Sequence, residues 1–453
     1  MTVFRSLLIG ALALAAAIPL RALLAGKRPR IRYVVWVLLL LPYLTPVLLT
    51  GYAYANFSLS LVHHPLLNTV FYAVLVWLKL TPLAVLVLCF APPPVSTEAA
   101  HCHRLLWRTR FDEWTFRFQA GYARGPLSAF ALVFLFAFSE FEMASLIGVN
   151  SWTVSLFDAH AGGLPLGESL QRMLWPLAWE VVALAIAVAA LAQHRVSPGR
   201  MATRSGGMHV IAWSHLTVAV ALVLLIPATI VLWGTIHGLT VVLKSFALGR
   251  EVVASLLFAS AATFLTSLVA FWWSRSSRGR RGRAATITNA VLRCVIVAGL
   301  LGPLVLSLVI LAGVQLAGVR VLRDTPIPLV VALSLMLLPS AVVLRLALQM
   351  TRPGASLHLA MLMRPSLAAR DLIWRLKTSG EFRAVVLLFI WAYWDLTASA
   401  ILAPITMTPV TVRLYNLMHY GQTAAMSAML CASFAAPVLV LLIIFGTRHW
   451  WAR

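Results

Sequence analysis

The sequence predicts an all-α, polytopic membrane protein with about eleven transmembrane helices in two parallel pseudo-repeats. Of its 453 residues, 61% are hydrophobic and only 11% are charged, whereas soluble domains carry about 25% charged residues. Many apolar runs exceed the ~18 residues that mark a membrane-spanning helix. A membrane barrel would instead show alternating segments of ~10 residues. One pattern occurs twice along the chain, which predicts two homologous halves.

The repeated pattern places an acidic residue in an apolar run and follows it with a Thr-Val-x-Leu-aromatic-Asp/Asn segment. Glu140 is followed by the segment 153–158, and Asp395 is followed by the segment 411–416. The two acidic residues are 255 positions apart, whereas the first threonines of the two segments are 258 positions apart. The second copy therefore contains an insertion of three residues.

In the first half, five apolar runs are bounded by charged or turn-forming segments. The first run stops before Lys27, and Pro46 and Pro82 lie within the second and third runs, where membrane helices tolerate proline. The fourth run carries Glu140. These runs predict helices at residues 4–25, 33–55, 66–92, 126–148 and 172–193.

The second half contains six apolar runs. Its opening run has no counterpart in the first half. Pro303 and Pro339 then repeat the placement of Pro46 and Pro82, and Asp395 lies in the last run but one. These runs predict helices at residues 209–236, 251–273, 289–316, 325–349, 384–404 and 423–446.

The loops indicate the orientation. One alternating set of loops, together with the C-terminus, holds 25 of the 36 Lys and Arg residues, and the other set holds seven. Positive charge accumulates in cytoplasmic loops, so the first set is expected inside. The N-terminus is then outside and the C-terminus inside, which agrees with an odd number of helices. The expected domains are residues 1–194, a cytoplasmic linker at 195–208, and residues 209–453.

Composition and motifs also exclude several classes of function. The net charge of +23 lies in short loops between apolar runs, which is typical of membrane topology and not of nucleic-acid binding. No nucleophile–base or metal-ligand constellation predicts an enzyme. Because His101, Cys102 and His103 are consecutive, they would point in different directions on a helix and could not share one ion. We expect no catalytic residue, no metal and no cofactor.

Two long cytoplasmic loops, 93–125 and 350–383, each lie directly before an acidic helix. Long loops in compact proteins usually have a function or are disordered. In the first loop, an apolar patch lies between arginines on a predicted short helix. Such a helix could enter a groove on a cytoplasmic protein or rest on lipid headgroups. The patch consists of Leu105, Leu106 and Trp107.

The first loop also contains Glu98-Ala99-Ala100, and the following helix runs from Gly125 to a Ser-Glu-Phe ending at Glu140. These features resemble the membrane subunits of binding-protein-dependent ABC importers. Two such units in one chain resemble the fused ferric-iron-type and thiamine-type permeases, over nearly the whole chain. Arg104 stands where the family's pattern has glycine, and the second loop has no Glu-Ala-Ala.

The resemblance implies a permease subunit of the bacterial inner membrane whose two halves form the substrate path. A separate cytoplasmic ATP-binding subunit, expected as a homodimer, would hydrolyse ATP, because this chain has no phosphate-binding Gly-x-x-x-x-Gly-Lys-Ser/Thr loop. A periplasmic or lipid-anchored protein would deliver the substrate. Ferric iron, thiamine, polyamines and inorganic anions are all compatible. The residues expected to couple to the ATPase are Glu98, Ala99, Ala100, Arg104, Leu105, Leu106 and Trp107 in the first loop, and Leu359, Met361, Leu362 and Arg364 in the second.

Acidic residues inside membrane helices are costly and usually face a cavity or a partner. The candidates for lining the path are Glu140, Glu142, Asp395 and Thr397. The alternative is structural: Glu140 and Asp395 would pair with Lys79, Arg293 or Arg345, or accept hydrogen bonds from backbone N–H groups.

Two other functions remain open from the sequence. In an ion-coupled secondary transporter, Glu140 and Asp395 would be proton or cation sites. In a non-transporting membrane component, the fold would be kept for assembly or sensing.

Overall fold

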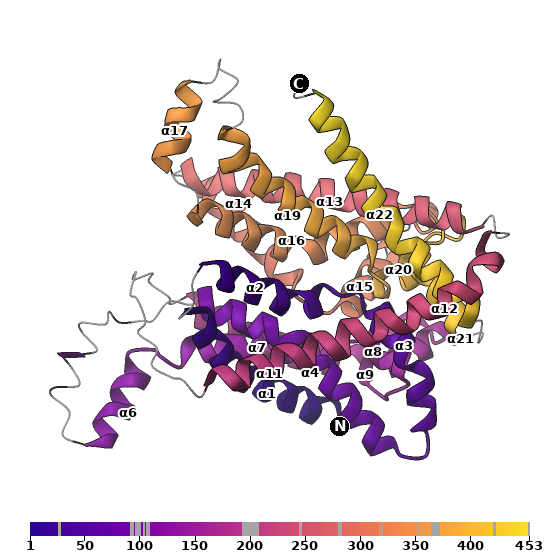
Figure 1. Ribbon diagram of the computed structural model, residues 1–453, viewed down its shortest axis with the longest axis horizontal. Coiled ribbons are helices and arrows are strands. Elements are labelled where there is room, and N and C mark those ends of the chain that lie inside the picture. The colour runs from indigo at the N-terminus through magenta and orange to yellow at the C-terminus, as the bar shows by residue number, and fades with distance from the viewer. Residues whose placement is uncertain are drawn as a thin grey trace. The chain divides into compact units, whose positions relative to one another are not determined.

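The computed structural model is entirely helical in the residues that it describes, with no strand among them. By packing, the chain divides after Trp233 into two compact units, residues 1–233 and 234–453 (Figure 1). The described residues are 1–25, 29–90, 95, 101–102, 105, 109–192, 208–243, 247–279, 283–316, 318, 320–351, 354–363, 372–419 and 423–451. Apart from Met208, the predicted linker 195–208 lies outside them.

The first unit contains the indigo to magenta helices of Figure 1. Two of them, α11 and the beginning of α12, belong to the second half that the sequence repeat predicts, which begins at residue 209. The compact units of the structure instead divide after Trp233. In order, the elements are α1 (Thr2–Ala25), α2 (Pro29–Leu44), α3 (Val47–Ser60), α4 (Pro65–Phe90), α6 (Arg110–Gln119), α7 (Arg124–Phe138), α8 (Glu142–Ile147), α9 (Trp152–Ala161), α10 (Leu166–Ala192), α11 (Met208–Val220), a π-helical segment (Ala221–Leu225) and α12 (Ile226–Leu243), which continues past Trp233.

The second unit contains the remaining helices. In order, these are α13 (Ala247–Gly279), α14 (Arg283–Ala298), α15 (Pro303–Leu316), a 3₁₀ turn (Arg320–Leu322), α16 (Ile327–Thr351), α17 (Gly354–Leu362), a π-helical segment (Trp374–Thr378), α19 (Ser379–Tyr393), α20 (Thr397–Leu402), α21 (Val410–His419) and α22 (Thr423–Trp451).

The two units repeat the same local order of helices around their acidic residues. The helices α7 and α19 both have 15 residues, α8 and α20 both have six, and α9 and α21 both have ten. The three-residue insertion of the second copy falls between α20 and α21. The internal repeat read from the sequence therefore corresponds to a repeat of structure.

Seven helices in the described residues are long and apolar enough to cross a membrane, or nine if each of two bent pairs is one span. The chain is thus a multi-pass helical membrane protein, although these criteria give fewer spans than the eleven expected. The bent pairs are α2 with α3, at 66°, and α14 with α15, at 118°. Their second helices begin next to Pro46 and at Pro303. Proline cannot donate the backbone hydrogen bond that would continue the preceding helix.

The prediction of one continuous helix at 126–148 and another at 384–404 is wrong. In each case the structure has two helices separated by a short non-helical segment, α7 with α8 and α19 with α20. The breaks occur at Glu140 and Asp395, whose side chains bond to the backbone of the following helix. Hydropathy does not report such breaks because the apolar run continues across them.

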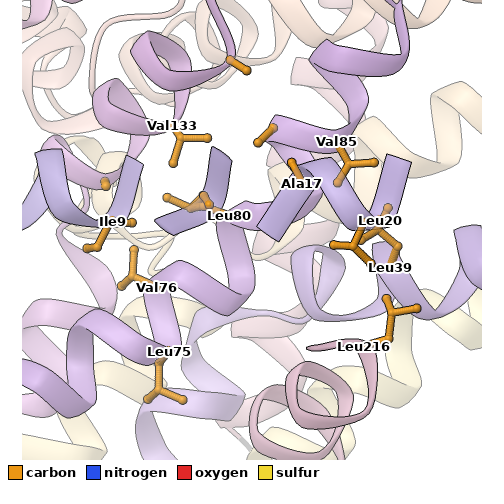
Figure 2. Close-up of a cluster of buried hydrophobic side chains, with 14 of the residues drawn as sticks. Ile9, Ala17, Leu20, Leu39, Leu75, Val76, Leu80, Val85, Val133 and Leu216 are labelled. Carbon is orange, nitrogen blue, oxygen red and sulfur yellow. The ribbon is translucent and has the colours of Figure 1, made fainter. Parts of the chain in front are cut away.

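The core of the first unit forms where α1 packs against α4 and α7. Small residues on α1, among them Gly10, Ala13 and Ala17, let the neighbouring helices approach closely, as is usual between membrane helices. Figure 2 shows Ile9 and Leu20 of α1 among the buried apolar side chains of this cluster.

The second unit uses α13 in the place of α1, packed against α16 and α19. Two hydrogen bonds join α13 to α16. The Thr266 hydroxyl donates to the Ser334 carbonyl at 3.2 Å, and the Ser334 hydroxyl is 3.3 Å from the Ala262 carbonyl. These side chains are buried, so small polar residues bind the two helices together inside the unit.

The π-helical segment 221–225 lies just before Pro227, which has no N–H to donate to the Val223 carbonyl. Hydroxyl groups of α3 supply donors here. Thr50 Oγ1 donates to the Val223 carbonyl at 3.0 Å, and Tyr54 Oη donates to the Leu222 carbonyl at 2.8 Å. These two hydrogen bonds hold the π-helical segment between α11 and α12 against α3 within the first unit.

Tyr393 makes the same kind of contact in the second unit. Its hydroxyl donates to the Ser433 carbonyl at 3.0 Å, and the residue four positions after Ser433 is Pro437. Side chains from neighbouring helices thus satisfy carbonyls that prolines leave without their usual backbone donor.

We expect the double variant Thr50→Val with Tyr54→Phe to lower the thermal unfolding midpoint in detergent. The two changes remove both hydroxyl donors and keep the side chains' approximate shapes, at a cost of about 1 kcal/mol per hydroxyl. The matched control is Thr69→Val with Tyr33→Phe, because the Thr69 hydroxyl bonds only within its own helix at an exposed position and Tyr33 is exposed. Equal midpoints for the two double variants would contradict this docking role.

Candidate functional site

The candidate site of the first unit is the helix break around Glu140. Between α7 and α8, the Glu140 carboxylate turns onto the first turn of α8. Met143 N–H donates to Oε1 at 2.5 Å and Ala144 N–H donates to Oε2 at 3.1 Å. These N–H groups have no helical partner because the backbone is interrupted. Glu140 therefore acts as a helix cap inside an apolar unit.

Three ionisable residues from other helices surround this cap. The Tyr72 hydroxyl of α4 donates to Glu140 Oε2 at 2.9 Å, and the Arg5 guanidinium of α1 lies 4.5 Å from the centre of the Tyr72 ring. Lys79, also on α4, interacts electrostatically with both Glu140 and Glu142, and its ammonium group donates to the Thr45 carbonyl. The first unit thus holds a connected ionisable network, which we call the Glu140 network: Arg5, Tyr72, Lys79, Glu140 and Glu142.

The threonine that follows the acid in each copy of the repeated motif has a geometric role. Thr153, in the first turn of α9, donates its hydroxyl to the Glu140 carbonyl at 2.9 Å, and Trp152 Nε1 donates to the Phe138 carbonyl at 2.7 Å. Ser151 caps α9 by accepting the Val154 N–H at 3.2 Å. The start of α9 therefore supplies donors to carbonyls at the break, and the repeated motif stabilises a broken helix.

The second unit builds the same break. Asp395 Oδ2 accepts both the Ala398 N–H, at 3.0 Å, and the Ser399 N–H, at 3.2 Å, at the start of α20. Thr411, in the first turn of α21, donates its hydroxyl to the Asp395 carbonyl at 2.9 Å. Thr397 is buried in the first turn of α20. Each acid thus accepts the N–H groups three and four residues later, and each motif threonine donates to the carbonyl of its acid, in both units.

The two breaks differ in what surrounds them. Alignment of Pro82 with Pro339 places Leu329 and Met336 where the first unit has Tyr72 and Lys79, and Thr397 stands at the position of Glu142. Leu329 is fully buried. At these three equivalent positions the second break has no ionisable side chain, so the contribution of Tyr72, Lys79 and Glu142 to the Glu140 network is specific to the first unit.

The sequence left several structural partners open for Glu140 and Asp395, and the structure shows which of them these acids contact. Both acids accept backbone N–H bonds, and Lys79 interacts with Glu140. Arg293 is exposed on α14, and Arg345 lies 4.7 Å from the centre of the Phe271 ring. Lining of a path by Glu140, Glu142, Asp395 and Thr397 stays a prediction. Tyr72 and Arg5 were not predicted as site residues, although a polar residue within an apolar run is the signal that could have found them.

Most of the predicted first coupling loop lies outside the described residues, namely Glu98, Ala99, Ala100, Arg104, Leu106 and Trp107. Leu105 is 73% exposed. In the second loop, α17 carries three of the predicted residues, all exposed: Leu359, Met361 and Leu362. Arg364 lies outside the described residues. Within the part of the chain that the structure describes, no group of three or more His, Cys, Asp or Glu could hold a metal ion.

The fold and the two breaks define a class: a multi-pass helical membrane protein in which one helical arrangement occurs twice. No protein-family model matches the chain, and neither a curated protein nor a solved structure matches it.

Proposed function

We propose that this chain is the membrane permease subunit of an ABC importer, coupled to a separate cytoplasmic ATPase. The observation that carries the proposal is the duplicated helix order around a broken, acid-capped helix. Transporters are commonly built from repeated halves, and broken membrane helices are tolerated where backbone groups find other partners or line a cavity. The proposed location is the bacterial inner membrane, with eleven spans, the N-terminus outside and the C-terminus inside.

Equivalent loops precede the two breaks and support a coupling role. The first contains α6, whose N-terminus has a capping box between Thr109 and Asp112. Phe111 and Phe118 of α6 are exposed. The second contains α17, with Leu359 and Leu362 exposed. Exposed apolar residues on short helices fit grooves of partner proteins, and rigid-body movement of the loops would transmit ATPase closure to the membrane helices.

We expect the chain, purified from its native membrane under mild detergent, to carry vanadate-sensitive ATP hydrolysis, although its own sequence has no phosphate-binding loop. Glu98→Arg with Leu105→Asp should reduce the retained hydrolysis at least ~5-fold, since the loss of one important interface contact costs over 1 kcal/mol. Ile405→Asp is the matched control, because Ile405 is exposed on the loop between α20 and α21, which the proposed topology places outside.

Absence of ATP hydrolysis from the purified wild-type protein would reject the proposal. Equal loss in the Ile405→Asp variant would show that the loop variant acts through folding and not through docking. Equal retention in both variants would reject the assignment of the first loop to coupling.

The Glu140 network favours a second candidate, an ion-coupled secondary transporter. Ionisable residues inside membrane segments commonly mark ion or proton pathways, and Tyr72, Glu140 and Lys79 are connected within the first unit. This candidate predicts substrate uptake into vesicles that hold this chain alone, with collapse on addition of an ionophore. The importer predicts no uptake without the ATPase.

A further inference from the structure

The second unit has an open groove of about 290 Å³ between α13, α16 and α19. Its walls are mainly apolar and come from all three helices, chiefly Phe264, Leu268, Leu348, Val385 and Leu388. Phe264 and Leu268 are exposed. An apolar groove that opens between membrane-spanning helices is suited to hydrocarbon.

Two side chains of opposite charge also line this groove, Arg345 of α16 and Glu381 of α19. Arg345 is held against the Phe271 ring, with its guanidinium 4.7 Å from the ring centre. The apolar span of α16 ends at Gln349, so Arg345 lies ~6 Å inside that end. Glu381 lies in the first turn of α19. Both charges thus lie near one end of the spans, where lipid headgroups are found.

Neither charge is required by the repeated fold. Alignment of the two units places Leu88 at the position of Arg345 and Pro126 at the position of Glu381. Leu88 is buried in the core of the first unit. The same helical arrangement therefore forms without these two charges, which indicates a role specific to the second unit.

We propose that this groove binds a phospholipid whose headgroup carries both a phosphate and a primary ammonium group, the phosphatidylethanolamine class. The Arg345 guanidinium suits the phosphate because it presents several N–H donors in a plane. The Glu381 carboxylate accepts from the ammonium group, and the acyl chains lie along the apolar walls. An anionic lipid without an amine would meet the same arginine but also the unfavourable charge of Glu381. Free phosphate would leave the apolar walls exposed.

The test is native mass spectrometry of the full chain, exchanged into detergent with equal amounts of phosphatidylethanolamine and phosphatidylglycerol. We expect wild-type protein to retain phosphatidylethanolamine about tenfold more than phosphatidylglycerol, the effect of one charge-assisted hydrogen bond. Glu381→Gln should bring this ratio close to one. Val385→Trp should reduce retention of both lipids by filling the groove, whereas Val343→Trp, an exposed position of α16 outside the groove, should change neither.

Equal retention of the two lipids by the wild-type protein would overturn the proposal, as would an unchanged ratio in Glu381→Gln. Equal effects of Val385→Trp and Val343→Trp would assign the bound lipid to the general membrane surface and reject the groove. Addition of inorganic phosphate should not displace the lipid; displacement at millimolar phosphate would identify an anion site instead.

Discussion

Replacement of Gly299 by alanine is expected to destabilise the protein by about 3 kcal/mol, at the upper end of overpacking effects. Gly299 follows the last residue of α14, at the 118° bend before α15. A Cβ atom at this position would lie 2.2 Å from the Leu335 carbonyl oxygen and 3.0 Å from Pro339 Cδ. A backbone oxygen and a proline ring cannot rotate away, so the helices themselves would have to separate.

The measurement is the thermal unfolding midpoint of the full chain in detergent, together with the fraction that elutes as a single species. Gly313→Ala is the matched control in the adjoining helix α15, because nothing lies within 4 Å of a Cβ atom there. Alanine within a helix is favoured over glycine by about 0.5–1 kcal/mol, so the control should be neutral or stabilising. A Gly299→Ala midpoint equal to that of the control would show that α14 does not approach Leu335 this closely.

The close approach of Gly299 illustrates what a sequence can and cannot predict in this chain. Pro339 predicts that the Leu335 carbonyl has no backbone donor, since its usual partner would be the residue four positions later. The helix that covers this carbonyl depends on tertiary packing, which hydropathy does not encode. The same holds before Pro227, where the hydroxyl groups that donate to the Val223 and Leu222 carbonyls come from α3, more than 160 residues away in sequence.

The repeat itself could be predicted, because Glu140 and Asp395 stand out in apolar runs and both are followed by a Thr-Val segment. The helix breaks could not be predicted, because the predominantly apolar run continues past each acid without a proline or a glycine at the break. Once the caps are seen, the motif has a local explanation: the acid accepts N–H groups of the next helix, and the threonine donates to the acid's own carbonyl.

The differences between the two units could also be predicted only in part from the sequence. The missing Glu-Ala-Ala of the second loop can be read directly from the sequence, whereas the replacement of Tyr72 and Lys79 by Leu329 and Met336 cannot. These positions belong to helices whose sequences resemble each other weakly. Their equivalence becomes clear because α4 and α16 pack in the same way against α7 and α19. The first break is therefore the better candidate for ion chemistry, and the second is the better candidate for a purely structural cap.

The difference between the two breaks leads to a second prediction, which concerns four variants of Glu140 and Asp395. Glu140→Ala and Asp395→Ala should each destabilise the protein by about 3 kcal/mol, because two buried N–H groups lose their acceptor in each unit. Asp395→Asn should fold almost normally, since a single oxygen, Oδ2, accepts both N–H groups and the amide keeps one such oxygen. Glu140→Gln should be intermediate, because Glu140 uses both of its oxygens.

The unfolding midpoints of these variants report the capping role, and transport by the folded variants separates capping from ion chemistry. If Glu140 carries only the cap, Glu140→Gln should transport in proportion to the amount of folded protein, as Asp395→Asn does. If the Glu140 network handles a proton or a cation, Glu140→Gln should lose transport beyond its loss of folded protein, whereas Asp395→Asn should not. Equal destabilisation by Asp395→Asn and Asp395→Ala would contradict the cap at the second break, because the amide preserves the acceptor that the cap requires.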